Sequence, residues 1–252
     1  MDIKLYQKAS KLILGSGRTA AFTGAGISVE SGIPPFRGED GLWNQYDPVF
    51  LDITYFHKNS LKSWELIKEV FYDYFGRAEP NTAHYSLVQL EEKKLLQSII
   101  TQNIDNLHQR AGSTNVIEYH GTSHELICTK CHAKCFAQDK HLVNLPPECE
   151  ICGGLLKPDF VFFGESIPVE AAANAADEAE QCDLFILVGT SGEIMPASII
   201  PYNAKQNGAK IIEINTNPSN YSDSITDIFL RGKATDVFKT LLGVISESLT
   251  EL

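Results

Sequence analysis

Short apolar runs alternate along the chain with segments whose apolar residues repeat at helical spacing. The runs predict buried strands, typical of a parallel sheet covered on both faces, at residues 19–24, 96–103, 160–164, 182–190 and 209–215. The helical pattern predicts an amphipathic helix at the N-terminus and further helices over 81–96, 169–181 and from Ala234 to about residue 249. Asn81 is a suitable N-cap for the second of these. Strands that alternate with helices predict a doubly wound α/β sheet, with ligands at the carboxyl ends of the strands.

The composition is that of an ordinary globular protein, since 43% of the 252 residues are hydrophobic and 21% are charged. The net charge of −11 repels phosphate backbones, so we expect no direct nucleic-acid binding. No apolar run approaches the ~20 residues that span a bilayer, and the N-terminus is too charged for a signal peptide. We therefore expect a cytoplasmic protein without membrane contact, whose six cysteines stay reduced and can bind metal.

Residues 121–157 interrupt the α/β pattern and carry five of the six cysteines. Four of them form two CxxC pairs, CTKC at 128–131 and CEIC at 149–152, with 17 residues between the pairs. This spacing lets four thiolates bind one zinc ion, and the closed shell leaves no position for a reactive water. Because the insertion is too short to bury a core of its own, we predict a structural zinc site made by Cys128, Cys131, Cys149 and Cys152. The alternative is four unrelated buried or redox-active cysteines.

The other cysteines and most of the histidines have ordinary roles in this prediction. Cys135 lies outside both CxxC pairs, and Cys182 opens a buried strand, so neither is expected to bind the metal. His84 falls on a predicted helix and is expected in the core. Three further histidines are expected at the surface or in loops, namely His57, His132 and His141.

A glycine-rich loop follows the first predicted strand. Gly24 and Gly26 allow a tight turn and close approach of a ligand, and Ser28 is expected to open a helix whose amides meet a pyrophosphate. The loop lacks the third glycine of the dinucleotide fingerprint and the lysine of a P-loop, so phosphate binding stays open at this point. Phe36 and Arg37 stand on a stiffened segment that can close over a ligand. The alternative is a surface turn with a buried Phe and a solvated Arg.

Polar residues gather where the second predicted strand ends, in the sequence QNID at 102–105. Asn103 and Asp105 can orient a polar ligand, although both are also suited to capping the helix that the pattern predicts to start there. Two histidines follow, His108 and His120, and spacing alone does not choose between them as a catalytic base.

The motifs GAGIS, GIPPFRG, GLW, TQNIDNLHQRAG, HG, the two CxxC pairs, FGE, GTS and IN occur in the order typical of sirtuins. The chain resembles this family of NAD-dependent protein-lysine deacylases from about residue 10 to 245. The resemblance implies a Rossmann-like domain and a small domain with a zinc ribbon. The implied division is 1–33, 80–120 and 158–252 for the Rossmann-like domain, 34–79 for the cofactor loop and helical part, and 121–157 for the zinc ribbon.

The resemblance also implies the role of each motif residue. Those that would bind NAD are Gly24, Ala25, Gly26, Ser28, Phe36, Arg37, Gln102, Asn103, Ile104, Asp105, Gly189, Thr190, Ser191, Asn215 and Ala234. His120 would be the general base, because an imidazole with a pKa of ~6.5 is largely neutral at physiological pH, and Asn103 and Asp105 would assist catalysis. An acyl-lysine protein or peptide would bind as an extended strand beside Val161, Phe162, Phe163 and Gly164.

The implied reaction moves the acyl group from lysine to ADP-ribose and releases nicotinamide. Relatives that remove succinyl or malonyl groups carry a Tyr and an Arg where Ile67 and Val70 align here, so acetyl or longer apolar acyl groups are expected. The segment GEIMPAS at 192–198 also departs from many relatives and is expected to alter the peptide groove. Two alternatives stay open, an ADP-ribosyltransferase or NAD glycohydrolase and an NAD-binding module without turnover. The sequence leaves the physiological substrate and the oligomeric state open.

Overall fold

A six-stranded parallel sheet forms the larger part of the molecule in the computed structural model, which describes residues 2–38 and 41–250. Its strand order is β3-β2-β1-β7-β8-β9. The strands are β1 Thr19–Thr23, β2 Ser98–Thr101, β3 Val116–Glu118, β7 Leu184–Val188, β8 Lys210–Asn215 and β9 Ile228–Arg231.

The strand order reverses direction at β1. From β1 the chain adds β2 and β3 on one side, then returns to place β7, β8 and β9 on the other. Ala21 of β1 is therefore paired with Ile99 of β2 on one side and with Ile186 of β7 on the other. In a doubly wound sheet the crevice at such a reversal point, beyond the carboxyl ends of the two central strands, is where ligands bind.

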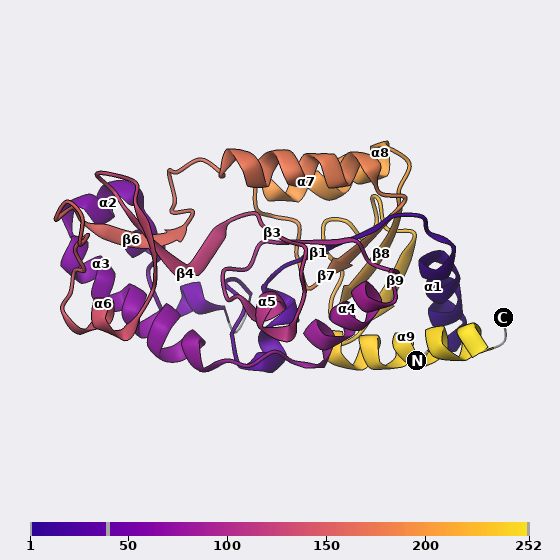
Figure 1. Cartoon of the computed structure of the whole chain (residues 1–252). Helices are drawn as coiled ribbons and strands as arrows, with labels where there is room; N and C mark the ends of the chain where they lie inside the picture. Colours follow the sequence, from indigo (N-terminus) through magenta and orange to yellow (C-terminus); the bar gives the residue numbers. More distant parts are fainter. Residues whose placement is uncertain (1, 39–40, 251–252) are drawn as a thin grey trace.

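Helices cover both faces of this sheet, as Figure 1 shows. One face carries α1 Ile3–Gly15, α4 Thr82–Glu92 and α9 Ala234–Thr250, and the other carries α7 Val169–Gln181 and α8 Ile200–Gln206. The residues of β7 alternate between the two resulting cores: Ile186 packs on the side of α9, whereas Phe185 packs on the side of α7. This two-sided burial explains the continuous apolar runs of the sequence and confirms the predicted fold class.

The helix starts follow from local side-chain capping. Asn81 Oδ1 accepts the backbone N–H of Ala83 at 2.9 Å at the start of α4, as predicted. Asp2 caps α1 in the same way, through the N–H of Lys4 at 3.0 Å. The helix predicted over 81–96 ends earlier, at Glu92, and Lys94 adopts a left-handed φ of 61° just beyond it.

A smaller module extends from one end of the sheet (Figure 1). It contains the antiparallel sheet β5-β4-β6 and a group of short helices. Trp64 of this module is fully buried and joins its short helices to its antiparallel sheet, since the indole N–H donates to the Leu156 carbonyl at 2.8 Å. The elements are α2 Ile53–Lys58, α3 Ser60–Ile67, the π-helical segment Lys68–Tyr74, β4 Gly121–Cys128, β5 Lys134–Phe136, α6 Asp139–Val143 and β6 Leu156–Phe160. The short helix α5 Leu107–Ala111 packs against α4 of the larger part. The domain boundaries given above stay a prediction.

Three sequence expectations are wrong. The run at 160–164 is not a strand of the parallel sheet: β6 ends at Phe160 in the antiparallel sheet, and the extended residues that follow leave Phe163 48% exposed. Two strands of the parallel sheet were missed, β3 and β9, which are edge strands of three and four residues and too short to form a distinct apolar run. No α-helix starts at Ser28, which lies between the 3-10 turns Ala25–Ile27 and Val29–Ser31.

The remaining 3-10 turns are Leu42–Asn44, Pro48–Leu51, Phe75–Arg77 and Ala197–Ile199. Among the described residues, no helix combines the length and the apolar character that crossing a membrane requires.

Candidate functional site

The candidate site lies at the reversal point, where the loops after β1 and β7 meet. The backbones of these loops pack directly on one another: Gly26 N–H donates to the Gly189 carbonyl at 2.9 Å. A Cβ added to Gly26 would lie 2.6 Å from Gly189 Cα, and Gly189 itself has a φ of +60°. These glycines are therefore required by the contact between the two loops, a constraint that the sequence pattern did not reveal.

A chain of polar contacts links the ends of four strands beside this contact. Asn215, at the end of β8, donates from Nδ2 to the Thr190 carbonyl at 3.0 Å. Gln102, just after β2, donates from Nε2 to Thr190 Oγ1 at 3.0 Å. His120, which follows β3, lies with Nδ1 3.0 Å from the Gln102 carbonyl oxygen. The structure thus brings together four residues that lie far apart in the sequence.

His120 is held in one tautomer by this last contact. A carbonyl oxygen only accepts hydrogen bonds, so Nδ1 carries the proton and Nε2 is left as the acceptor. Burial lowers the pKa of His120 below its ordinary value of 6.5, and the bond to Gln102 opposes this shift. The ring is therefore neutral near pH 7 and suited to accept a proton at Nε2.

The backbone of His120 is fixed as well as its ring. Its carbonyl oxygen accepts the N–H of Val161 at 2.9 Å, so the predicted substrate segment runs directly beside the predicted base. The next residue, Gly121, has a φ of +75°, and a Cβ there would lie 2.2 Å from the Asp159 carbonyl oxygen. Only glycine allows the chain to approach β6 this closely immediately after the histidine.

Asn103 and Asp105 meet at Ser28, whose side chain is fully buried. Ser28 Oγ donates to Asp105 Oδ2 at 2.7 Å, and Asn103 Nδ2 lies 3.3 Å from the same hydroxyl and 3.2 Å from the Gly24 carbonyl. Asp105 Oδ1 accepts the N–H of Leu107 at 3.0 Å, at the start of α5. One oxygen of this carboxylate thus binds the backbone at the start of α5, where Asn106 is the N-cap residue, and the other binds the buried Ser28 hydroxyl. Burial raises the pKa of Asp105, and these hydrogen bonds oppose the shift.

A buried polar column supports this loop, and sequence reasoning found only part of it. His108 Nε2 lies 2.9 Å from Thr23 Oγ1, which donates to Thr101 Oγ1 at 2.9 Å. Thr101 Oγ1 in turn accepts the backbone N–H of Asn103 at 3.0 Å. His108 therefore supports this loop through a hydrogen bond to Thr23 of β1, which lies 85 positions away in the sequence. The two threonines carried no signal, because their partners lie on different strands.

His84 completes the column from α4. Its ring lies 5.0 Å from that of His108, edge to face, and the residue is fully buried, as predicted. Burial lowers the pKa of His84 to about 4 and that of His108 well below its ordinary value. Both imidazoles are therefore neutral at physiological pH.

The segment with Phe36 and Arg37 folds back on an aromatic residue. The Phe36 ring lies 5.3 Å from that of Trp43, and the backbone N–H of Trp43 donates to the Phe36 carbonyl at 3.1 Å. Trp43 in turn lies 6.4 Å from the ring of Phe163. A row of three rings thus joins the predicted cofactor loop to the predicted substrate segment, while Arg37 is exposed. The motif GLW was the signal for Trp43, but it assigned no role.

The other predicted residues lie around these groups with fewer contacts. Ala234 is buried at the first position of α9, and Ser191 is exposed, with its carbonyl accepting the N–H of Asn220 at 3.0 Å. Ile104 is half-buried, and its carbonyl accepts both the N–H and the hydroxyl of Ser123. Phe162 is buried in the core of the small module, and Gly164 is exposed and has a φ of +91°.

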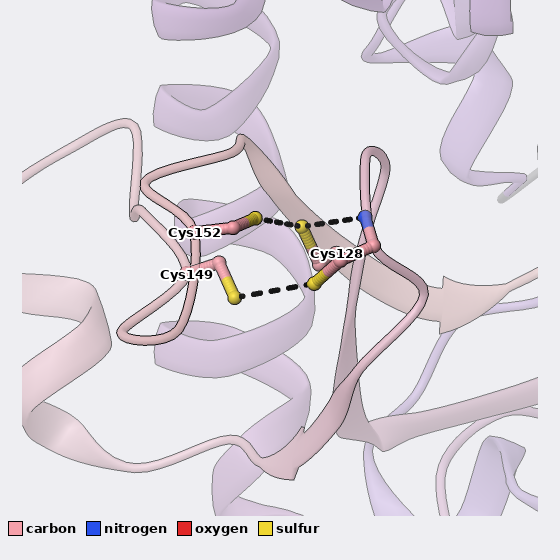
Figure 2. A group of neighbouring side chains, drawn as sticks. Cys128, Cys149 and Cys152 are labelled. Atoms are coloured by element: carbon pink, nitrogen blue, oxygen red, sulfur yellow. Dashed lines mark hydrogen bonds between the residues drawn. The ribbon is translucent and has the colours of Figure 1, made fainter.

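The four CxxC cysteines converge at the far end of the small module (Figure 2). Their Sγ atoms all lie within 4.8 Å of one another, with Cys128 3.5 Å from Cys152 and Cys131 3.7 Å from Cys149. Four sulfurs bound tetrahedrally at ~2.3 Å from a zinc ion lie about 3.8 Å apart, so the residues fit this metal. The backbone N–H of Cys131 lowers the pKa of the Cys128 thiol to about 6, which favours the thiolate that zinc binds.

The predictions for two residues near this cluster had different outcomes: the one for Cys135 is confirmed, and the one for His141 is wrong. Cys135 stays outside the group of four and is half-buried, as expected. The surface placement of His141 is wrong, because its ring is buried and its Nδ1 accepts the N–H of Gln138 at 3.2 Å, which caps α6. His57 and His132 are exposed, as predicted.

Comparisons with known proteins agree with this geometry. The model of the Sir2 family matches residues 24–196. A NAD-dependent protein deacylase of Pyrococcus abyssi is 43% identical over 236 residues, which cover 91% of this chain and 94% of that protein. NAD-dependent protein deacylase 2 of Archaeoglobus fulgidus is 42% identical over 251 residues, covering 97% and 98%.

Solved structures match over nearly the whole chain. A Sir2 homologue in complex with NAD superposes with a TM-score of 0.89 at 40% identity, covering 96% of this chain and 94% of that one. A Sir2 structure with a p53 peptide and NAD+ gives a TM-score of 0.88 at 34% identity, covering 99% and 100%. The likeness in sequence includes both the glycine loop at the reversal point and the cysteine module. This chain belongs to the Sir2 family, the sirtuins.

Proposed function

We propose that this protein is a NAD-dependent protein-lysine deacylase, which transfers an acyl group from lysine to ADP-ribose and releases nicotinamide. Membership of the Sir2 family supports this, as do the relatives named deacylases. The observation that carries the proposal is His120, a buried imidazole with its Nδ1 proton held by the Gln102 carbonyl and its backbone bonded to Val161. A binding module has no need for a neutral base fixed in this way beside a substrate segment.

His120 is the general base in this proposal. Its Nε2 takes the proton of a ribose hydroxyl, and the Gln102 carbonyl then stabilises the imidazolium through Nδ1–H. Burial keeps the ring neutral and ready to accept the proton at physiological pH. Asn103 and Asp105 act beside it by keeping the end of the pocket polar and poor in water.

NAD is the co-substrate, and when bound it supplies the ADP-ribose acceptor and the nicotinamide leaving group. The reversal point between β1 and β7 suits a dinucleotide, because two glycine loops meet there and leave backbone close to any ligand. The residues proposed to hold it are Gly24, Ala25, Gly26, Ser28, Phe36, Arg37, Gln102, Asn103, Ile104, Asp105, Gly189, Thr190, Ser191, Asn215 and Ala234. Phe36 guards the nicotinamide end, supported by its contact with Trp43.

The acyl-lysine peptide binds beside Val161, Phe162, Phe163 and Gly164. The exposed ring of Phe163 supports this position, because it leaves the segment open to contact with an extended peptide. Ile67 and Val70 are both fully buried among apolar side chains, which supports acetyl or longer apolar acyl groups rather than succinyl or malonyl.

Zinc, bound by the four cysteines, stabilises the small module without taking part in the reaction. A cytoplasmic location is proposed on the same cysteines, which suit a reducing compartment.

One assay tests this function against its alternatives. Protein, NAD and an acetyl-lysine peptide are mixed, and the products are followed by mass spectrometry. Deacylation predicts deacetylated peptide with O-acetyl-ADP-ribose. ADP-ribosylated protein, or free ADP-ribose without peptide turnover, indicates the transferase or glycohydrolase alternative, and no NAD consumption indicates a binding module.

The base is tested in the same assay with His120→Ala. The variant is expected to lose deacylation and to keep measurable NAD binding by calorimetry, because the cofactor residues are unchanged. His57→Ala, at an exposed histidine of α2, is the matched control and is expected to keep full activity. A His120→Ala protein with wild-type activity contradicts the assigned base.

A further inference from the structure

Lys157 is an unusual residue in the small module, because it is a lysine whose side chain is only 7% exposed. Burial lowers its pKa, and the pairing with Glu165 opposes the shift. Lysine side chains are almost never this buried unless they are paired. Neither the family motifs quoted above nor the proposed chemistry uses this residue.

The ammonium of Lys157 has a partner for each of its three protons. Its Nζ donates to the carbonyl oxygens of Pro158 at 3.0 Å and Phe160 at 2.9 Å, and it pairs with Glu165 Oε2 at 3.1 Å. It also lies 4.5 Å from the centroid of the Phe162 ring. Every one of these partners lies between residues 158 and 165.

Glu165, at the C-terminal end of residues 157–165, contacts both Lys157 and Phe162. Its Oε2 also accepts the backbone N–H of Phe162 at 2.8 Å, and its own N–H donates to the Phe162 carbonyl at 3.0 Å. The cation and the carboxylate thus fold residues 157–165 into a closed unit, with the carbonyls of Pro158 and Phe160 turned toward the ammonium. Charge-assisted hydrogen bonds of this kind are stronger than neutral ones and fix geometry.

The outer side of this unit makes the contacts that matter for the site. Val161 N–H reaches the His120 carbonyl, as described above. Phe163 pairs in parallel with residues 51–53, donating to the Leu51 carbonyl at 2.9 Å and accepting the N–H of Ile53 at 3.1 Å. The shape imposed by Lys157 therefore decides where the segment meets both the base and the small-module helices.

We propose that Lys157, paired with Glu165, is the positioning residue of the peptide-binding segment 161–164 and, through Val161, of the His120 backbone. This inference rests on the proposed deacylase function for the identity of the segment. It predicts a selective defect. The NAD site is built from the ends of the parallel strands, whereas the contacts of the Lys157 ammonium are confined to the segment itself.

The experiment compares Lys157→Met with the wild-type protein, using a fluorescent acetyl-lysine peptide. Peptide Kd is measured by anisotropy, and the KM for peptide, the KM for NAD and kcat are measured by turnover. Loss of the charged hydrogen bonds is expected to weaken peptide Kd and KM by about tenfold or more, with the KM for NAD changed by less than about twofold. Lys157→Arg keeps the charge and is expected to recover part of the loss. Glu165→Gln, which keeps an acceptor for Phe162, gives a smaller defect in the same parameter.

Lys134→Met is the matched control. Lys134 of β5 forms an ion pair at the surface, at 2.6 Å, with Asp159 of β6, the strand that also carries Lys157. Exposed pairs contribute little, so its peptide Kd should stay at the wild-type value. Equal peptide Kd for Lys157→Met and wild type, or equal losses for peptide and NAD, overturns the inference. If Lys157→Met does not fold, the decision passes to Glu165→Gln under the same criteria.

The outcome also separates this inference from the proposed function. A wild-type protein that binds the peptide without deacylating it contradicts the deacylase function, and the comparison of peptide Kd values still decides the role of Lys157. A wild-type protein that binds no acyl-lysine peptide overturns both.

Discussion

The buried histidine of α4 gives a quantitative prediction about acid stability. In the substitution His84→Gln, the glutamine carbonyl can accept the Asn81 N–H that His84 Nδ1 accepts at 3.2 Å, because Gln is a usual partner at this position of a capping box. The variant therefore removes a titrating group from the core and keeps the start of the helix. The expected consequence is a free energy of unfolding that depends less on pH.

The sign follows from where the proton binds. Burial lowers the pKa of His84 to about 4 in the folded protein, whereas the unfolded chain has the ordinary value of 6.5. Between these two values the unfolded state binds more protons, so the stability of the wild type rises with pH and is lost as pH falls through 6.5 toward 4. From pH 7 to pH 5 the loss due to this one group is about 2 kcal/mol, from roughly 1.5 pH units at about 1.4 kcal/mol each.

The assay is urea unfolding at pH 7 and pH 5, with zinc held constant, followed by circular dichroism. The decrease in unfolding free energy between the two pH values should be about 2 kcal/mol smaller in His84→Gln than in the wild type. Burial is the main cause of the low pKa of His108 and His84 only the smaller one, so the difference between the two proteins reports chiefly on His84. His57→Gln, on an exposed surface, is expected to keep the wild-type decrease. A difference below about 0.5 kcal/mol would refute the reasoning.

Three further predictions follow from the site. Gly26→Ala places a Cβ 2.6 Å from the backbone after β7 and should abolish NAD-dependent activity and lower Tm in a thermal scan, whereas Gly15→Ala, with nothing within 4 Å, should do neither. Cys149→Ser should lose the single zinc ion, measured by atomic emission, and Cys135→Ser should retain it. Because burial lowers the pKa of His120, kcat/KM should fall on the acid side only below pH 6.5, and an acid limb centred above that value would contradict the assigned base.

The parallel sheet was predictable because its central strands are buried on both faces. All five residues of β7 are buried, so the strand appears in the sequence as an apolar run. The same rule misassigned residues 160–164, of which Phe160 and Phe162 pack in the core of the small module and not on the parallel sheet. The edge strands β3 and β9 escaped it, because three or four residues are too few to show a pattern.

The candidate site was predictable as a set of motifs but not as an arrangement. Spacing could not choose between His108 and His120, because the tautomer of each ring is set by a partner far away in the chain, Gln102 for His120 and Thr23 for His108. The role of Lys157 was equally invisible, since a lysine in a strand is usually exposed and nothing local marks this one as buried. The motifs identified the polar residues of the site, and the strand order of the sheet determined where those residues come together.

His120 stands where the two parts of the molecule share backbone hydrogen bonds. Its ring is tied to the end of β2 through Gln102, and its carbonyl is tied to the segment that leaves β6 through Val161. A shift of the small module relative to the sheet would therefore stretch one of these bonds unless His120 moved too. Because Phe163 is paired with residues 51–53 in the same module, the proposed substrate segment and the proposed base are constrained together. In the proposed reaction this geometry couples the placement of the peptide to the orientation of the proton acceptor, as a reaction between two bound substrates requires.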